Sequence, residues 1–295
     1  LIRSKTLTTL KGVHCFSVPK RYQVKLRPTY AMRAGDLLGI DANPKTVKGR
    51  KLGIATGILY MAPALSAMAE QAKGIRVHIG GDFPMPQLKN LCPYASAGCL
   101  AACLNTSGKG GIPSVQNARI RKAREYQLDT ANFMIKLDHE VTRLKLMAKR
   151  DGLLPAVRLN GTTDILWERE DFTDSDGVYW SSIMAKHDDI TFYDYSKVPM
   201  KFRQIRPANY DLTFSLSESN DDHALEALKL GHNVAVVFRN EIPKFYMGRR
   251  VIRGDEHDAR FLDEKDPNGL WVGLLEKRTK GENGRHIDTS GFVRN

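Results

Sequence analysis

The sequence YDLTFSLSESNDDHALEALKLGHNVAVVFR, residues 210–239, decides the fold class. Its two ends are short apolar runs that are typical of β-strands, and the segment between them is typical of a compact helix. Asp221 or Asp222 can cap the start of that helix, and Gly231 can end it. Strands joined by so short a helical connection run parallel, with the helix packed outside the sheet. Residues 210–239 therefore predict an α/β fold.

The same pattern extends over the second half of the chain. Short β-type runs separated by polar or helical connections cover residues 156–160, 190–195, 210–217, 233–239 and 270–275. Two earlier segments, residues 57–61 and 74–80, compete for one further strand. These runs fit a parallel (β/α) barrel or partial barrel, similar to a TIM barrel, better than an open doubly wound sheet.

Two helices are expected ahead of these strands. Residues 114–128 form a basic helical stretch, and the next helix begins at Asp129 or Thr130. Apolar residues recur along this second helix at the spacing of a buried stripe, namely Phe133, Leu137, Val141 and Leu144.

Composition excludes several classes of protein. The chain has 295 residues, of which 42% are hydrophobic and 26% charged, so it is neither disordered nor collagen-like nor a coiled coil. It contains no run of about eighteen apolar residues and no signal-peptide core, so we expect no membrane contact and a cytoplasmic protein. The absence of P-loop, dinucleotide, zinc-protease and GxSxG motifs argues against ATP-driven, NAD-dependent and serine-hydrolase functions.

Positive charge is concentrated near the start of the chain. Lys and Arg number 45 against 33 for Asp and Glu, which gives a formal net charge of +12. Residues 1–50 hold eleven Lys and Arg against Asp36 and Asp41, so we interpret them as a basic extension of a domain spanning residues 51–295. Such charge predicts a nucleic acid or nucleotide as partner, unless it is only a solvated surface. The predicted phosphate contacts on the basic helix are Arg119, Arg121, Lys122 and Arg124.

The run LCPYASAGCLAACLN, residues 91–105, places Cys92, Cys99 and Cys103 close together. A closed zinc site needs four ligands, whereas three protein ligands leave a coordination position open, as in a catalytic metal or a [4Fe–4S] cluster with one exposed iron. Residues distant in sequence could instead complete a zinc site, namely Cys15, His78 or His139. Three small buried thiols without a metal are the simpler alternative.

Polar residues follow the predicted strands where each of them ends. In parallel barrels the carboxyl ends of the strands build the active site, so these side chains should converge. The candidate cofactor-binding residues are Arg158, Asn160, Thr162, Ser215 and Ser217. The candidate catalytic residues are Asp164, Lys197 and His257; His257 belongs to the acidic segment GDEHDARFLD, residues 254–263. That segment could equally be a solvated turn paired with Arg253 and Arg260.

The cysteine run, together with NARIRKAREY (117–126), VRLNGTTDILWE (157–168), FYDYSKV (192–198) and GDEHDARFLD, resembles a family of phage and plasmid proteins named after gene product 88. The resemblance covers residues 51–293. The three-cysteine motif ahead of a barrel-like strand pattern is also similar to that of radical S-adenosylmethionine (SAM) enzymes. This likeness implies a [4Fe–4S] cluster on the three cysteines and SAM as a further cofactor, with zinc as the alternative metal.

One departure from the radical-SAM pattern concerns the spacing of the cysteines. Those enzymes use CxxxCxxC, whereas six and then three residues separate the cysteines here. The wider first gap argues against SAM cleavage but remains compatible with binding of a cluster.

Three functions follow from these features. The first is a phage-type iron–sulfur protein, a radical-SAM-like enzyme that modifies nucleic acid or a nucleotide in the host cytoplasm. The second is a non-catalytic nucleic-acid-binding phage protein whose cysteines hold a structural metal. The third is a barrel transferase or hydrolase that uses zinc and the acidic segment. The sequence predicts no particular oligomeric state.

Overall fold

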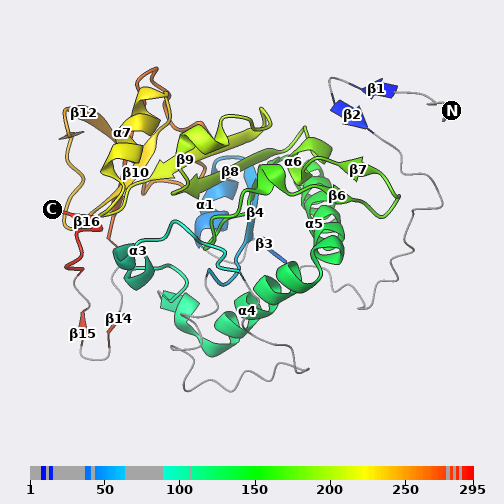
Figure 1. The fold of residues 1–295 in the computed structure, drawn as a ribbon, viewed down its shortest axis with the longest axis horizontal. Coiled ribbons are helices and arrows are strands. Elements are labelled where there is room, and N and C mark those ends of the chain that lie inside the picture. The colour runs from blue at the N-terminus through cyan, green and yellow to red at the C-terminus, as the bar shows by residue number, and fades with distance from the viewer. Residues whose placement is uncertain are drawn as a thin grey trace.

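A computed structural model describes residues 8–10, 13–15, 37–40, 44–63, 89–106, 108–276, 280–281, 284–285 and 288–295. Its centre is one large sheet (Figure 1). From edge to edge the strands are β11 (Phe245–Tyr246), β12 (Arg249–Arg253), β13 (Trp271–Leu275), β10 (Val234–Phe238), β9 (Tyr210–Ser215), β8 (Thr191–Ser196), β5 (Leu154–Arg158), β4 (Ile54–Leu59) and β3 (Leu38–Ile40).

Most neighbouring strands of this sheet are parallel. β4, β5, β8, β9, β10 and β13 lie side by side in the order in which the chain makes them, and each pairs in parallel with the next. β12 also runs parallel to β13, whereas β3 and β11 pair antiparallel with β4 and β12. The prediction of an α/β fold with a parallel sheet is confirmed. Among the described residues no pairing joins the edges β3 and β11, so a closed barrel is not observed.

The helices agree with the sequence where it predicted them. They are α1 (Pro44–Lys51), α3 (Ala97–Ala101), α4 (Pro113–Leu128), α5 (Thr130–Arg150), α6 (Ile183–Lys186) and α7 (Asp221–Lys229). Short 3-10 turns cover Gly108–Gly111, Trp167–Arg169, Met200–Arg203 and Arg260–Leu262. Within the described part of the chain, no helix has the length and apolar character needed to cross a membrane.

Three small hairpins accompany the main sheet. They are β1 (Thr8–Leu10) with β2 (Val13–Cys15), β6 (Phe172–Thr173) with β7 (Tyr179–Trp180), and β14 (Lys280–Gly281) with β15 (Gly284–Arg285). Residues 74–80, one candidate strand, lie outside the described residues, and β4 corresponds to the competing candidate. Because β3 pairs with β4, part of the expected basic extension belongs to the sheet.

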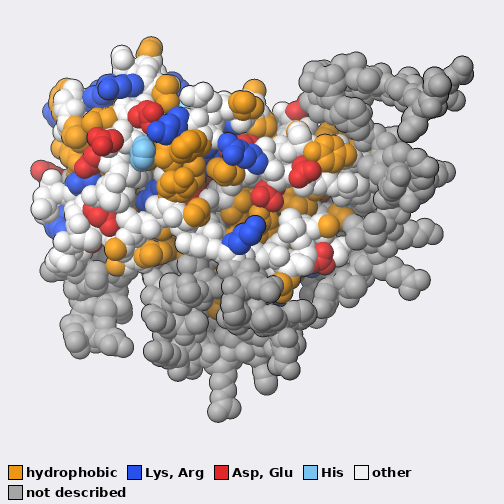
Figure 2. Space-filling model, in the orientation of Figure 1, with side chains coloured by type: hydrophobic (Ala, Val, Ile, Leu, Met, Phe, Trp, Pro, Cys, Tyr) orange, Lys and Arg blue, Asp and Glu red, His pale blue; other side chains and the backbone are white. Residues whose placement is uncertain are grey.

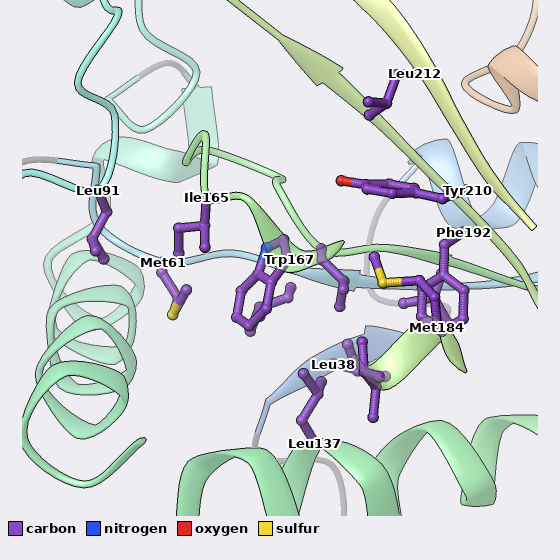
Figure 3. Close-up of a cluster of buried hydrophobic side chains, with 14 of the residues drawn as sticks. Leu38, Met61, Leu91, Leu137, Ile165, Trp167, Met184, Phe192, Tyr210 and Leu212 are labelled. Atoms are coloured by element: carbon purple, nitrogen blue, oxygen red, sulfur yellow. The ribbon is translucent and has the colours of Figure 1, made fainter. Parts of the chain in front are cut away.

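Helix α5 supplies much of the core. Asp129 caps it by accepting a hydrogen bond from the Asn132 N–H, and the four predicted stripe residues are completely buried. Their burial against the sheet stabilises the fold by removing apolar surface from water. Figure 3 shows Trp167, from the loop after β5, among side chains of α5 and the sheet that include Leu137 and Phe192.

A short last strand, β16 (Val293–Arg294), enters the sheet beside β10. It pairs with the carboxyl end of β10, at Val237 and Phe238, whereas β9 pairs with the amino end of β10. Since β13 occupies the other edge of β10 along its whole length, β9 and β16 share one edge. β9 and β10 therefore separate near their carboxyl ends, and β16 fills the space between them.

Candidate active-site cavity

A cavity of about 450 Å³ lies at the carboxyl ends of the parallel strands. It brings together ten of the residues that the sequence singled out: Cys92, Cys99, Cys103, Arg158, Asn160, Thr162, Asp164, Lys197, Ser215 and His257. They come from the cysteine loop, from the ends of β5, β8 and β9, and from the acidic segment. The convergence follows from parallel pairing, which places the carboxyl ends of neighbouring strands at one edge.

The three cysteines are half-buried, and all three line this cavity. Burial raises the pKa of the Cys92 and Cys103 thiols, and the negative charge of Asp164 raises that of Cys92 further. The Cys92 and Cys103 thiols are therefore protonated in the metal-free protein, and a metal would have to displace their protons. Within the described residues, no three His, Cys, Asp or Glu side chains are close enough to hold a metal ion. The three sulfur atoms thus line one cavity but are not already arranged as ligands around a metal position.

Helix α3, which carries Cys99, is held in place by the exit of β9. Glu218 accepts hydrogen bonds from Ser96 Oγ at 2.6 Å and from the Gly98 N–H at 2.7 Å. Burial alone would raise the pKa of Glu218, but these two bonds outweigh it and lower the pKa. Ser96 in turn caps α3 by accepting from the Cys99 N–H. The carboxylate of Glu218 therefore fixes the start of the cysteine helix.

The last residues of the chain press on the same helix. A Cβ atom added at Gly98 would lie 2.1 Å from Ser290 Oγ and 2.8 Å from Phe292 Cβ, both far inside normal contact distance. Only glycine fits this close approach. Phe292 and Val293 also line the cavity, so β16 and the turn before it form one of its walls.

Helix α4 supports the far end of the cysteine loop. Arg119 Nη1 donates to Asn105 O at 2.8 Å and to Asn105 Oδ1 at 3.0 Å, and the guanidinium lies 4.9 Å from the centre of the Tyr60 ring. Burial lowers the pKa of Arg119. Arg119 therefore holds the loop that follows Cys103.

The expected phosphate-binding face of α4 is not observed. Arg119 and Arg124 are buried, and Lys122 Nζ donates to Leu37 O at 2.7 Å. Arg121 is the exposed one of the four, and it pairs with Glu125 at 3.4 Å. On the face shown in Figure 2, Lys and Arg side chains are interspersed with acidic and hydrophobic ones and form no single patch.

The acidic segment folds onto the cavity through an ion pair. Arg158 Nη1 donates to Asp258 Oδ2 at 2.9 Å, and the guanidinium lies 4.7 Å from the centre of the Tyr195 ring. Burial alone would lower the pKa of Arg158, but Asp258 and neighbouring tyrosines keep it above its usual value. Burial, aided by Arg260, lowers the pKa of His257, so its imidazole is neutral at pH 7. Arg260 is itself fully buried, which rules out a freely solvated turn.

Asp164 and Lys197 lie at the centre of the polar wall. Asp164 accepts hydrogen bonds from Ser196 Oγ at 2.8 Å and from the Lys197 N–H at 2.7 Å, and burial raises its pKa. The Asp164 N–H donates to Leu91 O, next to Cys92. Lys197 Nζ donates to Ser215 Oγ at 2.9 Å and keeps further N–H donors for a bound molecule.

Two predicted residues shape the cavity wall by holding their own loop. Asn160 Oδ1 accepts from the Ile165 N–H at 2.9 Å and from Trp167 Nε1 at 3.1 Å, and Thr162 Oγ1 donates to Met61 O at 2.5 Å. These bonds occupy polar atoms that were expected to contact a cofactor.

Ser217 lies outside the cavity lining. It is buried, its N–H donates to Asn220 Oδ1, and its carbonyl accepts from Arg294 Nη2. Ser217 therefore holds the turn after β9, and its cofactor contact stays a prediction.

Several cavity residues escaped the sequence analysis. Lys48, Val237, Leu274 and Leu275 line it together with Phe292 and Val293. They come from α1, β10, β13 and β16, and apart from the strand pattern of β10 and β13 nothing in the sequence marks them. Apart from Lys48 these side chains are apolar, and they give the cavity a hydrophobic part beside its polar residues.

Comparison with known proteins identifies a family to which the chain is similar. A family model described as "Gene product 88" matches residues 62–295, which include the cysteine loop and all strands from β5 onward. No curated protein matches the chain, and no solved structure matches it.

Proposed function

The chain belongs to the gene product 88 family, and we propose that it is an iron–sulfur enzyme of radical-SAM-like type whose active site is the cavity at the carboxyl ends of the strands. The observation that carries this proposal is the place of the cysteines. They follow β4, the first strand of the parallel series, and face the same cavity as the polar ends of β5, β8 and β9. Three sulfur ligands beside such a cavity suit a metal centre that keeps a position open for a reactant.

The strand order supports a partial (β/α) barrel as the scaffold. β4, β5, β8, β9 and β10 are parallel neighbours in strict chain order, as a barrel-type sheet requires. The order reverses only after β10, where β13 lies between β10 and the earlier strand β12. Cys92, Cys99 and Cys103 would hold the [4Fe–4S] cluster. Such a cluster supplies one-electron chemistry and one iron open to a ligand such as SAM.

The remaining residues of the cavity would bind and orient the reactants. Lys197 offers a cation to an acidic group, and neutral His257 can take up or give a proton. The apolar side chains of β10, β13 and residues 292–293 would exclude water from part of the cavity. A volume of about 450 Å³ suits one small molecule or one nucleotide. A nucleic acid substrate would have to place a single unstacked nucleotide in it.

Metal analysis of protein purified without oxygen tests the proposal. We expect a brown protein that absorbs near 400 nm, with about four irons per chain and acid-labile sulfide. Cys92→Ser, Cys99→Ser and Cys103→Ser should each lose most of the iron, whereas Cys15→Ser, a change in the hairpin strand β2, should keep it. A colourless protein that carries zinc would contradict an iron–sulfur site and favour zinc chemistry with the acidic segment.

A second measurement separates an enzyme from a binding protein. Reduced, iron-loaded protein should cleave SAM, and Lys197→Met should impair this cleavage while leaving the iron content unchanged. If the loaded protein leaves SAM intact, yet binds nucleic acid with a steep dependence on salt, the non-catalytic alternative is favoured.

A further inference from the structure

A second pocket, of about 470 Å³, lies at the opposite ends of two of the same strands. It is formed by the loop before β9, the first residues of β9, the turn between α7 and β10, and Lys265. Four ionisable side chains line it: Arg206, Asp211, His232 and Lys265. No feature of the cysteine cavity extends to this end of the sheet, so the pocket needs its own explanation.

Among the described residues Arg206 forms no ion pair, although the negative charge of Asp211 lies near enough to act against the lowering of its pKa. Arg206 Nη1 donates to Arg203 O at 3.0 Å. The side chain is half-buried, and burial lowers its pKa. Holding a guanidinium partly out of water without a partner is unfavourable, and a bound anion would remove that cost.

Asp211 brings an unused acceptor to the same pocket. Its Oδ2 pairs with Lys265 Nζ at 2.7 Å, but its Oδ1 is buried and has no hydrogen-bond partner among the described residues. Buried polar atoms are nearly always satisfied, so this oxygen calls for a donor. The anion that Arg206 needs must therefore also carry an O–H or N–H group.

His232 also lines this pocket, and it carries no charge at neutral pH. Burial, with the help of Arg206, lowers its pKa to about 4, so the imidazole is neutral at pH 7. Arg206, Asp211 and Lys265 are the charged groups that act on it. A neutral imidazole can donate one hydrogen bond to an anion, and its pKa would rise if a negative charge were bound beside it.

We propose that this pocket binds a phosphate group that carries a proton, either free hydrogen phosphate or the monoanion of a phosphate monoester. A P–O⁻ oxygen would accept from Arg206, and the P–OH would donate to the Asp211 carboxylate, which has to turn to present its buried Oδ1. Phosphodiesters and sulfate have no such hydroxyl group at neutral pH. The pocket therefore discriminates against a nucleic acid backbone and favours a small phosphorylated molecule.

Binding at pH 6 tests the proposal, because the second pKa of a phosphate group lies near 6 and the protonated form is then abundant. Inorganic phosphate, methyl phosphate and sulfate are titrated into the protein of residues 1–295. Calorimetry measures the affinity of each ligand, and the NMR signals of the His232 ring report its pKa. We expect phosphate or methyl phosphate to bind at least tenfold more tightly than sulfate and to raise the pKa of His232. The tighter of the two ligands distinguishes free phosphate from a monoester.

Two variants and one control identify the residues responsible. Arg206→Gln should weaken phosphate binding by about tenfold or more, since it removes a charge-assisted hydrogen bond. Asp211→Asn should reduce the preference for phosphate over sulfate, because an amide can donate to sulfate. Arg121→Gln, a change at an exposed position of α4, should leave phosphate binding as in the wild type. Equal affinity for sulfate and phosphate, no binding of either phosphate, or normal binding by a folded Arg206→Gln variant would overturn the proposal.

Discussion

The carboxylate of Glu218 accepts a 2.7 Å hydrogen bond from the backbone N–H of Gly98, which joins the exit of β9 to the helix that carries Cys99. The two residues are far apart in sequence, and the contact makes the position of a cysteine depend on a strand of the sheet.

Loss of the Glu218 carboxylate should loosen α3. Glu218→Ala removes the acceptor of both hydrogen bonds, so the rate at which iodoacetamide modifies Cys99 in metal-free protein should rise several-fold, and iron retention should fall. Glu218→Gln keeps one acceptor oxygen and should have a smaller effect. Because Glu218 is partly exposed, we expect a stability loss of only about 1 kcal/mol. Glu241→Ala, at an exposed position, is the control, and equal Cys99 reactivity in all four proteins would refute the positioning role.

Gly98→Ala should destabilise the protein, because the new methyl group would collide with Ser290 and Phe292. Overpacking of this kind costs about 1–3 kcal/mol in the free energy of unfolding, which urea denaturation measures. Ala101→Ser adds an atom at an exposed position of the same helix and should change stability little. A Gly98→Ala variant as stable as the wild type would show that residues 290–292 do not press on α3 in solution.

Arg119→Gln should damage the structure of the cysteine loop. The guanidinium donates to two oxygens of Asn105 while it is buried, and hydrogen bonds from a charged group are worth about 1.5–3 kcal/mol. Urea unfolding should show a loss of that order, and Cys103 should become more reactive toward iodoacetamide. Arg121→Gln, on the exposed side of α4, should lie within about 0.5 kcal/mol of the wild type. Similar stability of the two variants would contradict the assigned role of Arg119.

Asp194 should make stability depend on pH. It is buried, accepts hydrogen bonds from the Asn160 N–H at 2.7 Å and Tyr210 OH at 2.8 Å, and burial raises its pKa to about 7. Between about pH 4 and 7 the folded protein holds a proton that the unfolded chain has released, so this group's contribution to stability falls as pH rises.

Comparison with Asp194→Asn isolates that contribution. The variant cannot titrate at this position, so its stability relative to the wild type should increase from pH 4.5 to pH 8, by an amount on the order of a few kcal/mol. Urea unfolding at several pH values measures the difference. Parallel stability curves for the two proteins would mean that Asp194 does not carry the raised pKa.

The sequence predicted the parallel strands and α5 well because their signals are local. The strands of the second half are short apolar runs bounded by polar turns, and the stripe from Phe133 to Leu144 has the period of a helix. The cavity could also be predicted in outline, since parallel strands bring their carboxyl ends to one edge. Arg158, Asp164 and Lys197 therefore lie where the pattern of the sequence indicated.

The remainder depends on contacts between distant segments. The role of Arg119 is set by the carbonyl of Asn105, and the amphipathic pattern of α4 is too weak to show which face is buried. Ser217 lies two residues after Ser215, which lines the cavity, but its backbone N–H donates to Asn220 Oδ1 in the turn after β9. β16 pairs through only two residues, which is too short for any strand signal. The pocket that Arg206 and Asp211 line combines the start of β9 with residues from separate loops.

The late position of β16 in the chain affects how the protein is assembled during synthesis. β4, β5, β8, β9 and β10 end more than fifty residues before Phe292, so these strands can emerge from the ribosome and pair while one side of the cavity still lacks its cover. On that side the cavity that the three thiols line is then open to solvent. The docking of β16 beside β10 brings Phe292 and Val293 into the lining, so the cavity is completed only after the strands that carry its polar residues have paired.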